Sequence, residues 1–187
     1  ASLSLRGREN PQWQLRSQLE GLDPGLFTGA ASEPAWYATL TADGSGGLAK
    51  LSGSARRGGF DLRVLPSTVR IERQRLQLQP LLLELLGGRA TLIGQADFAQ
   101  PENAKLRGRV SARGLRWGEG ANEVVADGDF GLAGSITQWA ALGKASLTRG
   151  EQSAQLDFDA RGNGERLRLQ RLRATMPSGR LDATGEV

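Results

Sequence analysis

Two carboxylates are the first candidates for chemistry in this sequence. Asp157 and Asp159 lie two residues apart in SAQLDFDAR, and this spacing on a β-strand would place both on one face. Paired carboxylates can carry out acid–base chemistry or bind a metal ion. In this segment, however, the acids alternate with apolar residues, which is typical of the solvated side of a strand. We therefore expect Asp157 and Asp159 to be surface residues, and we expect neither an enzyme nor a metal site.

Composition excludes most other catalytic chemistry. The 187 residues include no Cys and no His, which rules out thiolate nucleophiles, histidine bases and Cys/His metal sites. The segment GNGE at 162–165 resembles a phosphate-binding loop only superficially, because neither a helix pattern nor a Lys follows it. It is instead typical of a hairpin turn. We expect no cofactor.

The basic residues are in modest excess and are dispersed. There are 24 Lys and Arg against 20 Asp and Glu, a formal net charge of +4. A single-stranded nucleic-acid groove needs clustered bases and stacking aromatics, and aromatic residues make up 5% of this chain. We therefore expect no nucleic-acid partner. The chain starts at Ala1 without a Met, and we expect it to be a fragment of a larger protein. It has no run of 18 apolar residues, so any membrane anchor is expected to lie outside it.

Alternation of apolar and polar residues predicts the fold class. In KLRGRVSAR, Leu106, Gly108 and Val110 share one face while basic residues occupy the other. Glycine clusters separate such segments, as expected for tight turns between strands. We predict an all-β protein, an elongated, repetitive and mostly antiparallel sheet bent into a U-shaped hydrophobic groove. One or two short helical turns are expected, in EGLDPGLF at 20–27 and SITQWAALG at 135–143.

Two similar segments of 20 residues lie 91 residues apart in the chain. RLQLQPLLLELLGGRATLIG at 75–94 matches RLRLQRLRATMPSGRLDATG at 166–185 without a gap. In both copies the apolar residues change parity at the same place, after Leu78 and after Leu169, which predicts a β-bulge or a turn. PLLLELL alone is compatible with a helical turn, but its counterpart RLRATMP is poor helix sequence, so strands are favoured. We treat residues 1–187 as one repetitive segment with units around 75–96 and 166–187.

Something must cover the apolar face of such a sheet. A second sheet, closure into a barrel, or a partner or ligand could do so. The apolar positions are mainly Leu, Val, Ala and Gly, and large aromatics are few, which favours an unfilled groove over an ordinary packed β-core. Aliphatic walls suit acyl chains, whose burial yields about 0.8 kcal/mol per methylene. The packed core remains the alternative interpretation.

Three segments carry a resemblance to a known family. LEGLDPGLF at 19–27, SARGLRWGEG at 111–120 and the unit LRLQRLRATMPSGRLDATGEV at 167–187 resemble the periplasmic part of the TamB family, of the translocation and assembly module. This family belongs to the wider AsmA-like group of repetitive β-groove proteins. The resemblance covers nearly the whole chain, but it consists of repeat texture and one moderately specific segment, GLDP, without an invariant catalytic motif.

The resemblance implies a β-taco-like fold and a location in the periplasm of a Gram-negative bacterium, as part of an inner-membrane-anchored protein. The implied function is a hydrophobic conduit that moves phospholipids towards the outer membrane and supports outer-membrane protein assembly. Its partners would be phospholipid acyl chains, a TamA-type outer-membrane barrel and nascent outer-membrane proteins. Two alternatives stay open: a groove that templates strands of barrel or autotransporter clients, and a purely structural β-solenoid.

The residues expected to line the groove are the apolar members of the alternating segments. They are Leu76, Leu78, Leu81, Leu83, Leu92, Phe98, Leu106, Val110, Phe130, Leu156, Phe158, Leu167, Leu169, Leu172 and Leu181. Arg75, Arg89, Arg166 and Arg180 are expected to face water or lipid headgroups on the opposite side.

Overall fold

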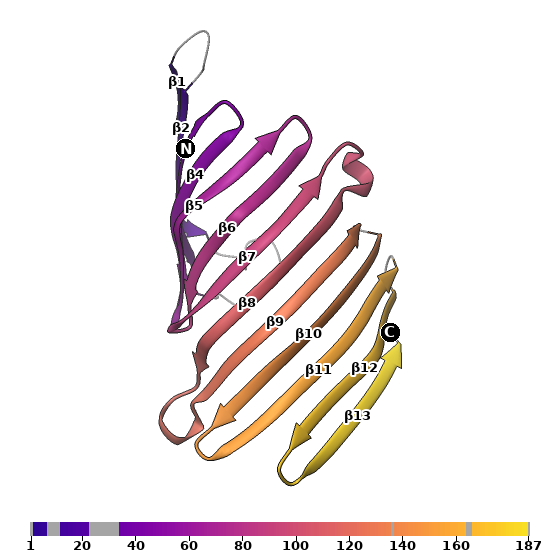
Figure 1. Cartoon of the computed structure of the whole chain (residues 1–187). Coiled ribbons are helices and arrows are strands. Elements are labelled where there is room, and N and C mark those ends of the chain that lie inside the picture. Colours follow the sequence, from indigo (N-terminus) through magenta and orange to yellow (C-terminus); the bar gives the residue numbers. More distant parts are fainter. Residues whose placement is uncertain (1, 7–11, 23–33, 136, 164–165, 187) are drawn as a thin grey trace.

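Thirteen strands form a single sheet in which the order of the strands is their order along the chain (Figure 1). The structure is a computed structural model that describes residues 2–6, 12–22, 34–135, 137–163 and 166–186. The strands are β1 (Ser2–Arg6), β2 (Gln12–Leu22), β3 (Trp36–Ser45), β4 (Leu48–Arg57), β5 (Phe60–Glu72), β6 (Arg75–Leu85), β7 (Gly88–Asp97), β8 (Lys105–Trp117), β9 (Val124–Ser135), β10 (Gln138–Arg149), β11 (Gln152–Asn163), β12 (Arg166–Met176) and β13 (Gly179–Glu186). Two 3₁₀ turns, η1 (Pro101–Asn103) and η2 (Gly120–Asn122), flank β8.

The predicted all-β, antiparallel and repetitive architecture is confirmed. Every strand pairs antiparallel with its sequence neighbours, and the sheet is open and uncurled. Figure 1 shows β8–β13 face on and β2 nearly edge on, so the sheet turns progressively along its length. The predicted bend into a U-shaped groove is not found: the described strands form an open, uncurled sheet whose apolar side is a broad, open face.

The helical turn predicted for 135–143 is wrong. Residues 138–143 form the first half of β10, which pairs with β9 on one side and β11 on the other. A helix here would leave the hydrogen-bonding groups of both neighbours without partners, and this cost outweighs a weak local helix preference. In the other predicted turn, 20–22 end β2 and 23–27 lie outside the described residues. No helix within the described ranges is long and apolar enough to cross a membrane.

The parity change in the repeat is a β-bulge in both copies. β6 shifts register against β7 between Leu78 and Leu81, and β12 shifts against β13 between Leu169 and Leu172. Each bulge returns the following leucines to the same face as the preceding ones. The bulge in β6 contains Pro80, a residue that a central strand accepts only where a ladder hydrogen bond is already missing.

Three other strands contain bulges that also keep their apolar residues on one face. β2 shifts register after Leu19 and β8 after Ala112, and in both the bulge contains a glycine in the left-handed region, Gly21 at φ 66° and Gly114 at φ 65°. In β5 the bulge is fixed by a side chain instead. The Ser67 hydroxyl donates to the Leu65 carbonyl at 2.8 Å and accepts the Leu82 N–H of β6 at 2.9 Å.

The sheet has no second layer packed against it in the described structure. The buried apolar residues are small, mostly alanines together with Val69, and no large side chain is fully buried. The accessible surface is 13292 Å², whereas a compact monomer of the same 20.0 kDa would expose about 8,700 Å². The excess is what an uncovered sheet requires, because both of its faces remain accessible.

Candidate functional site

One side of the sheet is apolar from β2 to β13. Paired residues of antiparallel strands point to the same side, so the register identifies which side chains share it. Strand by strand, this side contains Leu15, Ala42, Leu51, Ser67, Leu81, Leu92, Val110, Phe130, Gly143, Phe158, Leu172 and Ala183. We call this side the apolar face and the opposite side the polar face.

The predicted lining residues gather on the apolar face, with one exception. Leu76, Leu78, Leu81, Leu83, Leu92, Leu106, Val110, Phe130, Leu156, Phe158, Leu167, Leu169, Leu172 and Leu181 share it by register. Phe98 instead follows the last residue of β7, where its N–H donates to the Gln74 carbonyl at 2.7 Å. Whether a lipid or client contacts these residues stays a prediction.

The apolar face is uneven in height. β6 and β12, the corresponding strands of the repeat, carry mostly leucine on this face, and we call them the leucine strands. The five strands between them carry many small residues there: Ala90, Gly94, Ala96, Gly108, Ala112, Gly128, Gly134, Ala141, Gly143, Ala145, Ala160 and Gly162. We call the apolar face of β7–β11 the floor; on it these small residues lie among large side chains such as Leu92, Phe130 and Phe158.

Part of that floor is covered by aromatic rings lying over glycines. Trp139 of β10 pairs with Gly162 of β11, and a Cβ at Gly162 would collide with the indole. Outside the floor, Trp13 of β2 covers Gly44 of β3 in the same way. Because the glycines have no side chain, the rings lie down on the neighbouring strand and cover its backbone.

Phe130 and Phe158 share a third glycine. Both pair with Gly143 of β10, which lies between their strands, and their ring centroids are 5.8 Å apart. A Cβ at Gly143 would stand 2.7 Å from the Phe158 ring. These aromatic–glycine pairs could not be recognised from the sequence, because they join residues that only the strand register brings together.

The apolar face is accessible rather than sealed. Leu40 and Leu181 are 40% and 58% exposed, and Leu106, Leu132 and Leu167 are exposed as well. These exposed leucines lie on β3, β8, β9, β12 and β13, so no element of the described structure covers this face. An accessible apolar surface of this extent marks an interaction site.

The polar face is covered with cross-strand ion pairs. Arg113 contacts Asp129 at 2.8 Å and Arg173 contacts Asp182 at 2.9 Å. Hydrogen bonds from Arg180 and Arg173 lower the pKa of Asp182 to about 2. Hydrogen bonds from the Ser111 hydroxyl and Arg113 lower the pKa of Asp129. These carboxylates are held ionised by their partners.

The candidate carboxylates of β11 also lie on the polar face. Asp157 and Asp159 pair by register with Arg173 and Arg171, and an Asp157 oxygen lies 3.3 Å from the Arg171 guanidinium. Among the residues with described positions, no group of acids could hold a metal ion. The predicted headgroup-side arginines Arg75, Arg89, Arg166 and Arg180 occupy the polar face by register, too.

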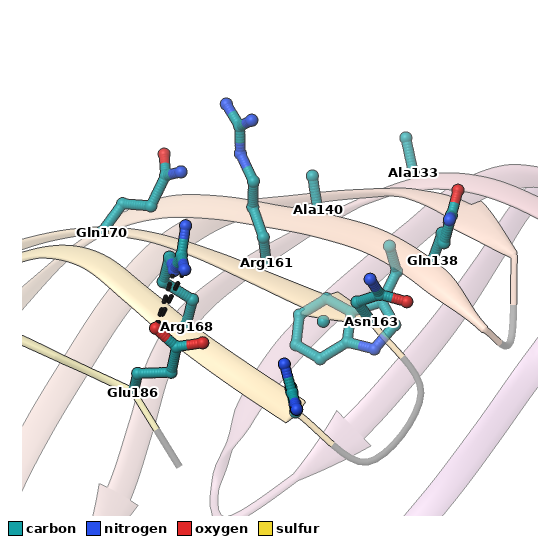
Figure 2. A pocket seen from close by; sticks show the side chains of 11 residues that line it. Ala133, Gln138, Ala140, Arg161, Asn163, Arg168, Gln170 and Glu186 are labelled. Atoms are coloured by element: carbon teal, nitrogen blue, oxygen red, sulfur yellow. Dashed lines mark hydrogen bonds and ion pairs between the residues drawn. The ribbon is translucent and has the colours of Figure 1, made fainter.

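A shallow hollow lies at one end of the polar face (Figure 2). It is lined mainly by Ala133, Gln138, Ala140, Arg161, Asn163, Arg166, Arg168, Gln170 and Glu186. Figure 2 shows Arg161 and Ala140 projecting from the same side of the sheet, with Arg168 bound to Glu186 at 2.9 Å. The hollow has a small apolar floor and a basic wall.

Comparison with protein-family models, curated proteins and solved structures finds no match to this chain. The chemistry of the two faces therefore carries the functional argument. The apolar face offers a wide hydrocarbon surface with almost no hydrogen-bonding groups. The polar face offers arginines, most of them engaged with acids, and one hollow whose lining includes three arginines and one acid.

Proposed function

We propose that the apolar face binds phospholipid acyl chains and that this chain is one segment of a periplasmic lipid conduit. The conduit would carry phospholipids between the inner and outer membranes of a Gram-negative bacterium. It would support outer-membrane protein assembly together with a TamA-type barrel, as the resemblance to the TamB family implies. The observation that supports the proposal is the continuous, accessible apolar face from β2 to β13.

The polarity of the face favours acyl chains over client strands. A client β-strand requires backbone hydrogen bonds, which a sheet offers only along its edges. The apolar face presents side chains that are almost all hydrocarbon, and the hydroxyl of Ser67 is already engaged with β5 and β6 backbone. An acyl chain requires no hydrogen bonds, so it can lie on this face without leaving a polar group unsatisfied.

The expected affinity follows from the open geometry. Full burial of a 16-carbon chain at about 0.8 kcal/mol per methylene would contribute on the order of 12 kcal/mol. A chain lying on one face buries roughly half of its surface, which halves this figure before ordering costs. Such binding is reversible, and a transport surface needs reversible binding.

Two leucines on adjacent strands provide a matched test. Leu40 of β3 lies on the apolar face and Leu48 of β4 on the polar face, and they are 40% and 45% exposed. A photo-crosslinking amino acid replaces each in turn, and the purified protein is illuminated with the zwitterionic lipid phosphatidylethanolamine. Capture at Leu40 should exceed capture at Leu48 at least several-fold.

The matched exposure makes the outcome decisive. Equal capture at both positions would show that exposure alone determines labelling, and the acyl-binding proposal would fail. Capture of protein instead of lipid at Leu40 in whole cells would favour the client-strand alternative. No capture at either position would leave the apolar face as a structural surface, as in the solenoid alternative.

A further inference from the structure

The charges on the polar face are unevenly divided along the strands. We divide the polar face of β6–β13 into two halves. The basic half lies beside the turns after β5, β7, β9 and β11, and the balanced half lies at the opposite ends of the same strands. On the polar face the basic half carries Arg75, Lys105, Arg107, Arg109, Arg161, Arg166, Arg168 and Arg171 against Asp97, Asp159 and Glu186. The balanced half carries Arg89, Arg113, Arg116, Lys144, Arg173 and Arg180 against Glu84, Asp127, Asp129, Asp157 and Asp182. The excess positive charge of these strands lies almost entirely in the basic half.

Ion pairing differs between the halves in the same direction. Every arginine on the polar face of the balanced half contacts a carboxylate, at distances up to 3.6 Å. In the basic half, four arginines make no ion pair with any described residue: Arg107, Arg109, Arg161 and Arg166. These guanidinium groups are exposed and remain able to bind an external anion.

Bulky apolar side chains also stand out of the basic half. Ile93 and Leu142 are 57% and 64% exposed although they lie on the polar face. They share one row across the sheet with Arg109 and Gly131. Neither has an apolar neighbour of comparable size in that row: Ile93 pairs with Arg109, and Leu142 lies between Gly131 and Asp159.

The hollow in Figure 2 lies in the same region. Arg161, Arg166 and Arg168 border it, and Ala133 and Ala140 form a low floor between them. A guanidinium can donate two parallel hydrogen bonds to a phosphate, which makes arginine the preferred side chain for binding phosphate groups. The hollow is therefore suited to a phosphate-bearing headgroup.

We infer that the basic half of the polar face docks on the surface of an anionic phospholipid bilayer. Unpaired arginines would contact lipid phosphates, and Ile93 and Leu142 would reach the boundary between headgroups and acyl chains. The face is broad, since six strands at about 4.8 Å spacing span roughly 24 Å from β7 to β12. A protein interface would instead be expected to centre on aromatic anchors, and the basic half has no Trp, Tyr or Phe on its polar face.

This inference is independent of acyl-chain binding, because it concerns the opposite side of the sheet. The apolar face does not discriminate between anionic and neutral lipids, whereas the basic half must. A requirement for anionic lipid therefore separates the two surfaces in one measurement.

The test is flotation of the purified chain with vesicles. One set contains phosphatidylcholine alone and the other adds about one third phosphatidylglycerol. The triple variant Arg107→Gln, Arg109→Gln, Arg161→Gln removes three charges from the basic half. At about 1 kcal/mol per basic residue, or roughly five-fold each, it should lose on the order of a hundred-fold in partition onto the anionic vesicles.

The control is the triple variant Arg89→Gln, Arg113→Gln, Arg116→Gln in the balanced half, which removes the same charge. It should lose less than ten-fold, and far-ultraviolet circular dichroism checks that both variants keep the sheet. A second variant, Ile93→Gln with Leu142→Gln, leaves the charge unchanged and should weaken binding several-fold. Equal binding to neutral and anionic vesicles, or equal loss in the two triple variants, would overturn the inference.

Discussion

Gly94 and Gly185 occupy the same position in the two copies of the repeat but differ in their surroundings. Gly94 of β7 lies close to the backbone of the neighbouring strand β8, and a Cβ there would stand 2.8 Å from the Arg107 carbonyl oxygen and 3.0 Å from the Gly108 Cα. Gly185 lies on β13 at the edge of the sheet, and a Cβ there meets nothing within 4 Å. Alanine substitution at these two positions should therefore have opposite effects.

The expected magnitudes follow from two terms. Replacing glycine by alanine restricts the unfolded chain, which stabilises the fold by about 0.4–1 kcal/mol where the new Cβ fits. Forcing a methyl group against backbone that cannot move away costs about 1–3 kcal/mol. Gly94→Ala should lower the free energy of unfolding by about 1–2 kcal/mol. Gly185→Ala should leave it unchanged or raise it by up to about 1 kcal/mol.

Urea denaturation followed by tryptophan fluorescence measures both variants, since the chain has four tryptophans. Hydrogen exchange at β7, β8 and β13 amides shows whether each effect is local to its strand pair. If Gly94→Ala proved stabilising, or if Gly185→Ala cost as much as Gly94→Ala, close approach of β7 and β8 would not be the reason for glycine at this position.

Two further predictions concern single side chains. Ser67→Ala should lower the free energy of unfolding by about 1–3 kcal/mol, because it leaves the Leu82 N–H without its partner at the bulge. The control Ser54→Ala, at an exposed position, should change the free energy of unfolding by less than 0.5 kcal/mol. Similar losses in the two variants would show that the Ser67 hydroxyl does not stabilise the bulge. The pKa of Asp182 is lowered from 3.8 to about 2, so its ion pairs contribute stability above about pH 4 that is lost as the pH falls through 2. A carboxyl-carbon NMR titration of Asp182 should therefore show a midpoint near 2. A midpoint near 3.8 would show that Arg173 and Arg180 do not lower the pKa of Asp182.

The parity of the leucines was enough to predict the bulges. Leucines at 76 and 78, then at 81 and 83, can share a face only if one residue is inserted between them, and the same displacement follows Leu169. Pro80 at that point supports the same conclusion. This part of the fold is local, so the sequence alone could determine it.

Pairing between distant residues was not predictable in the same way. Trp13 meets Gly44 across 31 positions, and nothing near either residue indicates the other. A short helical turn was expected in SITQWAALG, whereas its residues from Gln138 on form a strand because they pair with both β9 and β11. The uneven charge of the polar face was also missed, since it emerges only when the register aligns eight strands.

The strand order of the sheet has a consequence for how the chain reaches its folded state. Each strand pairs with the strands directly before and after it in sequence, so the mean sequence separation of its contacts is small for an all-β protein. Such a low contact order removes the long loop closures that slow most β-folds, and stability is shared between nearest neighbours as in repeat proteins. The chain can thus assemble progressively, each emerging hairpin adding to the strand that precedes it, without waiting for distant segments to be synthesised.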